Sequence, residues 1–330
     1  MKKLTLAFAL AAALFGCAPA TSSVETTTAA EASAAETEAL PEVSYRHADI
    51  DGLDLFYREA GPKDAPTILL LHGFPSSSHQ YRRLIDALGR DYHVIAPDYP
   101  GFGFSAAPES TLRGGSYAYT FDHLTDAIEK LVSQLGQRRV YIYMFDFGAP
   151  VGFRLALRHP DWVAGIISQN GNAYMDGIGP LLRAEWSLPA EKIPEARRKM
   201  LSLEATKMQY LAGASHEERV SPDGWMFDQL MIERPGRDAV LLSLMEDYHT
   251  NIEAYPSWQK WLREHEPPTL VVWGKNDPIF VEAGAKAYLR DVPDAELHLL
   301  DGAHFAVEEH APEIATLVAR FVDKAESKRR

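Results

Sequence analysis

The chain of 330 residues carries a formal net charge of −13, and hydrophobic residues make up 46% of it. This length and composition allow one large hydrophobic core, with or without a small added domain. The acidic residues are spread along the chain, which indicates a soluble surface and argues against nucleic acid as a partner. One cysteine excludes an internal disulfide framework, and beyond residue 20 no apolar run approaches the ~18 residues of a membrane-spanning helix.

The first 17 residues have the pattern of an export signal. Two lysines precede an apolar run over residues 4–15, which is too short to span a membrane. The stretch LFGC then resembles a bacterial lipobox, in which Gly16 precedes the residue that would carry lipid, Cys17. We therefore expect an exported, membrane-anchored lipoprotein that faces the periplasm or the exterior. The alternative is cleavage by ordinary signal peptidase after Ala20, which would release a soluble periplasmic or secreted form.

A low-complexity stretch separates this signal from an alternating pattern. Residues 18–42 are mainly Ala, Thr, Ser and Glu, so we expect a disordered tether that cannot bury enough apolar surface to fold. From residue 43 onward, short apolar runs alternate with amphipathic segments. Strands are expected within residues 53–61, 67–74, 92–103, 140–145, 163–170, 269–274 and 295–300, and helices within residues 121–136, 148–159 and 312–324. This alternation predicts a mostly parallel sheet with helices on both faces.

The rhythm changes between about residues 172 and 255. No convincing strand is present there, and amphipathic segments dominate, including those at residues 194–213 and 238–264. We therefore expect a helical cap at 172–255 that interrupts an α/β core formed by residues 43–171 and 256–330.

Four groups with chemical potential follow expected strands: the HGFP turn after Leu71, then Asp146, Asp277 and His304. Sites in open parallel sheets lie at the carboxyl ends of the strands. Taken alone, Asp277 fits an ordinary turn or helix-cap aspartate, and His304 fits a loop residue. Together, at strand ends, the three residues come in the order nucleophile, acid, histidine, which is the order of the α/β-hydrolase fold.

From about residue 43 to residue 323 the chain resembles the α/β-hydrolase superfamily, and within it the epoxide hydrolase and haloalkane dehalogenase branch. The stretches that carry the resemblance are HGFPSSSHQYR, APDYPGFGFS, FDFGAPVGFRLALRHP, VVWGKNDPIF and LDGAHFAVEEHAPE. The resemblance implies an eight-stranded, mostly parallel sheet with a helical cap, and an oxyanion hole formed by the backbone N–H groups of Phe74 and Phe147. Met144 departs from it, because a small residue is usual two positions before the nucleophile. No metal cluster or nucleotide fingerprint is present in the sequence, so we expect no cofactor.

The nucleophile is the most informative feature of this pattern. Attack by Asp146 on an ester carbonyl would give a high-energy anhydride, whereas attack on a saturated carbon gives an ordinary alkyl ester. By the resemblance, His304 would then activate a water that attacks this ester, and Asp277 would orient His304. Ser105 is the rival nucleophile, but its GFGFSAAP context lacks the second glycine of a nucleophile elbow. His72 is expected to hydrogen-bond the loop rather than to act as a base.

The leaving group distinguishes the two activities of this branch. A departing halide needs N–H donors, and haloalkane dehalogenases commonly have a Trp directly after the nucleophile. Here that position is Phe147, and the third residue of HGFP is Phe74, so neither side chain offers a donor. Trp186 or Trp225 in the insert remains available for this role.

Epoxide hydrolases of this branch use two tyrosines from the cap to hold and protonate the epoxide oxygen. MQYLAGA resembles the first tyrosine motif, at Tyr210, and EDYHTN resembles the second, at Tyr248. His249 stands where an arginine is common, and tyrosines on amphipathic helices also serve simply as packing residues. Tyr174 and Tyr255 are further candidates.

We therefore predict a hydrolase that acts through an alkyl ester on Asp146, with epoxide hydrolysis as the leading activity. Haloalkane dehalogenation is the alternative, and a catalytically silent hydrolase fold that binds a small molecule is the second alternative. The expected partner is a small substrate with an electrophilic carbon, and membrane contact is expected only through the lipid anchor.

Overall fold

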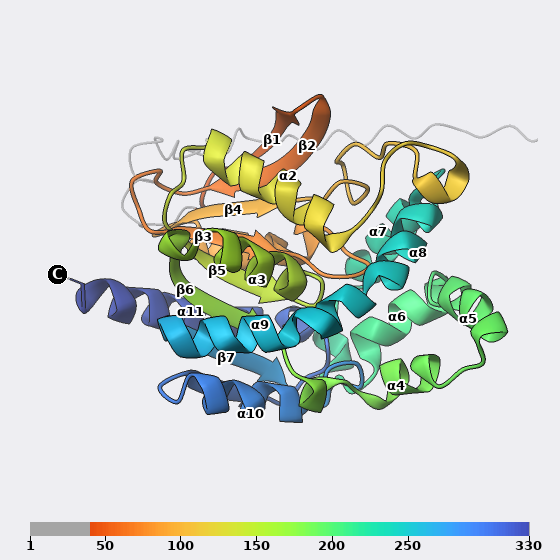
Figure 1. The fold of residues 1–330 in the computed structure, drawn as a ribbon. Coiled ribbons are helices and arrows are strands. Elements are labelled where there is room, and N and C mark those ends of the chain that lie inside the picture. Colours follow the sequence, from red (N-terminus) through yellow and green to blue (C-terminus); the bar gives the residue numbers. More distant parts are fainter. Residues whose placement is uncertain (1–39, 330) are drawn as a thin grey trace, which may run out of the picture. The chain divides into compact units, whose positions relative to one another are not determined.

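Eight strands form one sheet in the computed structural model, which describes residues 40–329 (Figure 1). The strands are β1 (Val43–Ile50), β2 (Leu53–Ala60), β3 (Thr67–Leu71), β4 (His93–Pro97), β5 (Val140–Phe145), β6 (Val163–Gln169), β7 (Thr269–Gly274) and β8 (Glu296–Leu300). Their order across the sheet is β1-β2-β4-β3-β5-β6-β7-β8. Only β2 runs antiparallel to its neighbours, and the other pairs are parallel. The predicted eight-stranded, mostly parallel sheet is confirmed.

Strand β1 is the strand that the sequence pattern did not single out. It pairs with β2 through a two-residue turn at Asp51 and Gly52, both at positive φ, which is the usual geometry of a tight hairpin. Several of its side chains are exposed at the edge of the sheet, so its sequence lacks the continuous apolar run that marks the inner strands.

Helices cover both faces of the sheet, and this explains the uninterrupted apolar strands. On β5, Val140, Ile142 and Met144 belong to one apolar core, whereas Tyr141 and its alternate neighbours belong to the other. Helices α1 (Arg82–Leu88) and α11 (Ala306–Ser327) pack on one face, and α2 (Phe121–Gln134), α3 (Gly148–Arg158), α9 (His249–His265) and α10 (Glu282–Asp291) contribute to the other core. Because both faces are buried, every position of β5 is buried.

The helices between β6 and β7 group at one end of the sheet, at the right of Figure 1. They are α4 (Pro180–Trp186), α5 (Ile193–Lys199), α6 (Leu203–Leu211), α7 (Pro222–Ile232) and α8 (Arg237–Asp247), followed by α9. The amphipathic segment at 194–213 is two helices, because Ser202 caps α6 by accepting a hydrogen bond from the backbone N–H of Ala205. The predicted boundary at residue 255 lies inside α9, whose Trp258 stacks on Phe153 of α3.

The predicted signal segment with Cys17, and residues 18–39 of the predicted tether, lie outside the described residues. Within residues 40–329, no helix combines the length and the apolar character needed to cross a membrane.

Candidate active site

Asp146 lies at the sharp corner between β5 and α3. Its φ of 48° is in the left-handed region, which costs a residue with a Cβ roughly 1–2 kcal/mol. Such strain persists only where the surrounding structure fixes it, and it is frequent at functional sites. The side chain is 6% exposed, so the corner holds a carboxylate that is nearly removed from water.

Two close approaches shape this corner. A Cβ at position 73 would lie 2.4 Å from the Cβ of Asp146, so only glycine lets the loop after β3 pass so near. This approach brings the backbone N–H of Phe74 to Oδ1 of Asp146, at an N···O distance of 2.5 Å. On the other side, the sulfur of Met144 lies 2.7 Å from where a Cβ at position 152 would be, so Gly152 provides the space for it. The unusual Met144 is therefore matched by a glycine on α3.

The structure brings His304 and Asp277 to Asp146 from the ends of two other strands. Nδ1 of His304 lies 2.7 Å from Oδ2 of Asp277, and Nε2 points toward Oδ2 of Asp146 at 3.8 Å. That second distance exceeds hydrogen-bond reach, and Nε2 has no hydrogen-bond partner within the described part of the chain. The other oxygen of Asp277 accepts the backbone N–H groups of Ile279 and Phe280, at 2.7 and 3.0 Å. These bonds fix Asp277, and Asp277 fixes the histidine ring.

Asn170 belongs to the same network and was missed in the sequence. It follows β6 directly, has a φ of 48°, and is fully buried. Its Nδ2 donates to Oδ2 of Asp277 at 2.7 Å, and its Oδ1 accepts the backbone N–H of Gly274 at 3.0 Å. The available signal was its place: a polar residue directly after a buried strand, at the same edge as the other site residues.

Burial and neighbouring charge set the protonation of the central pair. Burial raises the pKa of Asp146, and the charge of His304 and the amides of Phe74 and Phe147 offset this only in part. Burial lowers the pKa of His304, but the carboxylates of Asp277 and Asp146 outweigh this effect, so the pKa is raised overall. The pKa of each of these two side chains thus depends on the charge of the other.

The other histidine and the rival serine have structural contacts. His72 is fully buried, and its Nε2 accepts the backbone N–H of Tyr99 while Nδ1 donates to the carbonyl of Gly73. Burial lowers its pKa to about 3, so it stays neutral, in agreement with a loop-holding role. Ser105 donates to the carbonyl of Asp98 at 2.7 Å and accepts the N–H of Phe56 at 2.9 Å, so its hydroxyl is fully used in the loop.

A cavity of about 310 Å³ lies over Asp146, at the lower end of the size range of small-molecule sites. Phe74, Phe147 and Tyr248 lie in its wall together with Asp146. The rest of the lining comes mainly from α4, α5, α6, α8 and the loop after β7, and consists of Leu181, Leu182, Ala184, Glu185, Trp186, Leu188, Ala196, Met200, Met208, Gln209, Met245, Ile279 and Phe280. Asp146 thus opens into a mostly apolar chamber with a few polar groups.

Tyr248, at the junction of α8 and α9, lines the cavity. Burial raises the pKa of its hydroxyl well above the usual value, and Tyr255, Asp146 and a hydrogen bond with Tyr255 raise it further. Tyr255 in turn accepts a hydrogen bond from Nδ2 of Asn172 at 3.1 Å. The Tyr248 hydroxyl is therefore held in its protonated form, next to a supporting tyrosine.

The structure does not bring Tyr210 to the cavity. Its hydroxyl donates to Oδ2 of Asp228 on α7 at 2.5 Å, and its ring stacks on Phe305 at 3.9 Å. The preceding residue, Gln209, lines the cavity instead. Helix α6 presents Met208 and Gln209 to the chamber, and Tyr210, about 100° further around the axis, faces α7 instead.

Of the other aromatic residues considered from the sequence, one lines the cavity and two lie away from it. Trp186 lines the cavity, whereas Trp225 packs against Tyr210 and lies under the ammonium group of Lys207. Tyr174 donates its hydroxyl to Asp291 at 2.8 Å, away from the chamber.

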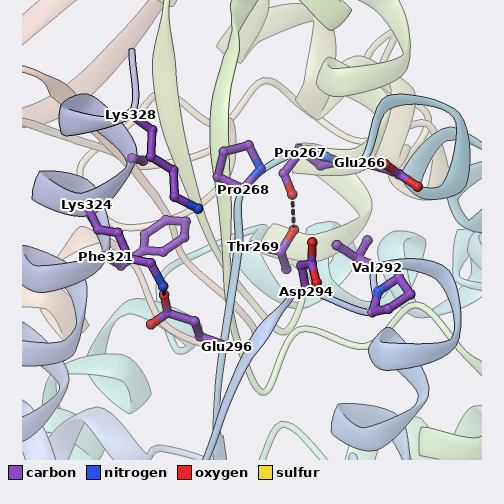
Figure 2. Close-up of a pocket in the computed structure, with 12 residues that line it drawn as sticks. Glu266, Pro267, Pro268, Thr269, Val292, Asp294, Glu296, Phe321, Lys324 and Lys328 are labelled. Atoms are coloured by element: carbon purple, nitrogen blue, oxygen red, sulfur yellow. Dashed lines mark hydrogen bonds and ion pairs between the residues drawn. The ribbon is translucent and has the colours of Figure 1, made fainter. Parts of the chain in front are cut away.

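A second cavity of similar size, about 320 Å³, lies at the amino-terminal ends of β7 and β8 (Figure 2). Its polar groups largely bond each other: Lys324 pairs with Glu296, and Thr269 donates to the carbonyl of Pro267. None of the predicted site residues lines it. The cavity over Asp146 is therefore the candidate active site.

Comparison with known proteins agrees with this fold. Residues 66–311 match the alpha/beta hydrolase fold family, and the chain belongs to that family. An uncharacterized hydrolase of Saccharomyces cerevisiae is 43% identical over 281 residues, which cover 83% of this chain and 95% of the yeast protein. The chain is thus a hydrolase of the α/β-hydrolase family.

The relatives of named activity include both a haloalkane dehalogenase and an epoxide hydrolase. A haloalkane dehalogenase of Bradyrhizobium diazoefficiens is 29% identical, over 87% of this chain and 97% of its own length. Epoxide hydrolase 2 of Caenorhabditis elegans is 22% identical, over 86% of this chain and 80% of its own length. A crystal structure of a DBJA mutant superposes with a TM-score of 0.72 at 26% identity, covering 86% of this chain and 99% of the other.

The comparisons correct the predicted localisation. We expected an exported bacterial lipoprotein with Cys17 as its anchor. The yeast hydrolase is matched over 95% of its length, so what it shares with this chain is the hydrolase domain, and neither it nor the bacterial dehalogenase supports an export signal or a lipid anchor. The prediction rested on composition alone, a short apolar run after two lysines. We therefore withdraw that localisation.

Replacing Tyr210 by Phe tests the placement of this side chain. We expect a loss of about 1–3 kcal/mol in the free energy of unfolding, because a buried carboxyl loses its hydroxyl donor while the stacking on Phe305 remains. Turnover per folded molecule should stay within about twofold of the parent's, since even a factor of ten would need 1.36 kcal/mol of barrier. Urea unfolding and initial rates measure the two effects, and a large fall in turnover without a change in stability would contradict the assignment.

Asp228 gives an expected pH dependence of stability. Burial, with a contribution from Glu308, raises its pKa to about 7 although its hydrogen bond from Tyr210 acts in the opposite direction. A carboxyl whose pKa is raised by folding stabilises the fold below the unfolded pKa, and this contribution is lost as the pH rises from about 4 to about 7. Asp228→Asn should therefore be more stable than the parent at pH 8, with a smaller difference at pH 5. Thermal unfolding at both pH values measures this, and a variant less stable at pH 8 would refute it.

Proposed function

We propose that this protein hydrolyses epoxides through a covalent alkyl ester on Asp146. The observation that carries the proposal is the chamber itself: a buried carboxylate at a nucleophile corner shares an apolar cavity with a protonated tyrosine hydroxyl, Tyr248. A carboxylate nucleophile suits a saturated electrophilic carbon, and a neutral phenol suits a leaving oxygen that needs a proton.

In the first step, the free oxygen of Asp146 attacks. Oδ1 is held by the amide of Phe74, so Oδ2 is the oxygen available for attack. Its electron pair forms a bond to an epoxide carbon, the carbon–oxygen bond of the ring breaks, and the ring oxygen takes the proton of Tyr248. The result is a hydroxyalkyl ester on Asp146, with all atoms of the substrate retained.

In the second step, His304 acts as the base. Its free Nε2 faces the carboxyl of Asp146, so a water near it can lose a proton to Nε2 while attacking the ester carbonyl carbon. The carbonyl oxygen is Oδ1, which the amide of Phe74 already holds, and this amide and that of Phe147 stabilise the oxyanion. Collapse releases the diol, which takes the proton from His304. The regenerated acid loses the proton that restores Tyr248.

Alkylation also prepares the base electrostatically. In the resting enzyme the negative charge of Asp146 helps to raise the pKa of His304. Ester formation neutralises Asp146, so this contribution disappears and His304 releases its proton more easily. The histidine is thus more readily neutral, and able to accept a proton from water, in the state in which a base is needed.

Haloalkane dehalogenation is the second candidate. It is favoured by the dehalogenase relatives and by Trp186 on α4, which lines the cavity and carries an indole N–H donor. Against it, Phe74 and Phe147 contribute only aromatic rings to the wall beside Asp146, so the two side chains nearest the corner offer no donor to a halide.

The His304→Gln variant tests both candidates at once. Because water activation fails while alkylation proceeds, we expect the ester on Asp146 to accumulate with epoxides, and intact-protein mass spectrometry should detect it. An epoxide adds its whole mass to the protein, whereas a haloalkane adds only its alkyl group.

The Asp146→Asn variant is the control, since it should give no adduct with either substrate. Accumulation with haloalkanes alone would replace epoxide hydrolysis by dehalogenation, and no adduct with any electrophile would remove Asp146 as the nucleophile.

The Tyr248→Phe variant tests the proton donor. Loss of a general acid should slow epoxide opening by roughly 10²- to 10⁴-fold, while decay of a preformed ester stays unchanged because that step uses His304. Rapid-mixing kinetics separate the two steps. Tyr174→Phe, which removes a hydroxyl outside the chamber, is the matched control. Equal opening rates in the parent and Tyr248→Phe would exclude Tyr248 from the site.

A further inference from the structure

Gln209 is a polar side chain whose place in the cavity wall has no structural explanation. It lies on α6, is only 3% exposed, and lines the same chamber as Asp146 and Tyr248. Its Nε2 has no hydrogen-bond partner among residues 40–329. Leaving such a donor unsatisfied in the interior costs about 1–3 kcal/mol, so a native fold retains it only for a reason.

A second buried glutamine shows that this fold can satisfy such a side chain. Gln229 on α7 accepts from the hydroxyl of Thr206 at 2.9 Å, and its Nε2 donates to Glu233 at 2.9 Å and to the carbonyl of Leu201 at 3.3 Å. Both ends of Gln229 are therefore bonded, and it lies outside the chamber. The amide of Gln209 differs because its available partner is whatever enters the cavity.

The other groups in the cavity wall indicate which substrate atom can accept the hydrogen bond of the Gln209 amide. Most of the lining is apolar, and the carboxylate of Glu185 is bonded to Arg197 at 2.9 Å. The polar groups left in the wall are Asp146, the Tyr248 hydroxyl, the Gln209 amide and the indole of Trp186. Asp146 attacks carbon, so the neutral donors remain for the oxygen that leaves. Trp186 is 40% exposed, so Tyr248 and Gln209 are the more enclosed of these donors.

We propose that Gln209 donates an Nε2–H hydrogen bond to the ring oxygen of the epoxide and to the alkoxide that forms from it, an inference that rests on the epoxide hydrolysis proposed above. An epoxide oxygen has two lone pairs, and Tyr248 supplies one donor. An amide does not transfer its proton at neutral pH, so Tyr248 gives the proton and Gln209 stabilises the charge that develops while the carbon–oxygen bond breaks. Gln209 thus takes the place that Tyr210 does not fill, from the adjacent position on α6.

The test uses the full-length protein with His304→Gln as background, so that the ester accumulates and its formation is measured directly. Styrene oxide is the epoxide probe and 1-bromobutane is the halide probe. Into this background we would introduce Gln209→Met, which keeps the length of the side chain but removes the donor. Gln209→Glu is a second variant of the same shape, which cannot donate when ionised. Gln229→Met is the matched control, because it removes a buried glutamine outside the chamber.

We expect both Gln209 variants to slow ester formation with styrene oxide roughly 10- to 100-fold. This is the effect on the rate of losing one hydrogen bond to a charge that develops in the transition state. In the protein that retains His304, Gln209→Met should leave the rate of ester decay unchanged. By that step the former epoxide oxygen is a hydroxyl and no longer carries the developing charge. Gln229→Met should lower the free energy of unfolding but leave the rate of ester formation equal to that of the His304→Gln background.

The outcomes separate this inference from the function on which it rests. Ester formation at the background rate in both Gln209 variants would overturn the role of Gln209 and leave epoxide hydrolysis intact. A loss confined to 1-bromobutane would also overturn it, because the donor would then serve a halide. Absence of any styrene oxide ester in the His304→Gln background would remove the proposed function, and this inference with it.

Discussion

The site depends on one constraint: a carboxylate must stay ionised and reachable after it has been removed from water. Burying an unpaired charge is costly, so Asp146 requires close, directed partners. The fold supplies them with a left-handed corner, an amide from the loop after β3, and a histidine aligned by Asp277. Each partner comes from the end of a different strand. The strand order of the sheet is therefore what allows this carboxylate to exist.

In the mechanism proposed above, the same burial couples the two chemical steps. Both side chains are buried, so the charges of Asp146 and His304 influence each other strongly, and the pKa of each depends on the other. In that mechanism, neutralising the carboxylate by alkylation would lower the pKa of the histidine. Asn170 and the amides around Asp277 hold the acid that orients this histidine. The hydrogen bonds thus fix the orientation of the ring, while the charge of Asp146 influences its protonation.

The helices between β6 and β7 provide most of the wall of the chamber over Asp146. Helix α6 turns Tyr210 toward Asp228 and Phe305, and this leaves Gln209 in the chamber wall, while the junction of α8 and α9 presents Tyr248. A shift of one position on a helix changes the face by about 100°, so the motif MQYLAGA offers two different donors depending on how α6 is rotated. Which of these side chains faces the chamber thus depends on helix packing more than on the identity of the motif.

The sequence by itself determined the sheet apart from its edge strand β1, the order of the candidate site residues and the corner at Asp146. Strands buried on both faces must be apolar throughout, and the carboxyl ends of parallel strands must meet at one edge, so both features are visible in a linear chain. It could not determine which face of α6 meets the cavity, because apolar and polar residues are distributed around that helix, as Leu203, Met208 and Leu211 show. Nor could it pair Asn170 with Asp277, which are joined only when β6 and β7 lie side by side. Such contacts depend on the rotation and closure of whole elements, and only the tertiary structure decides those.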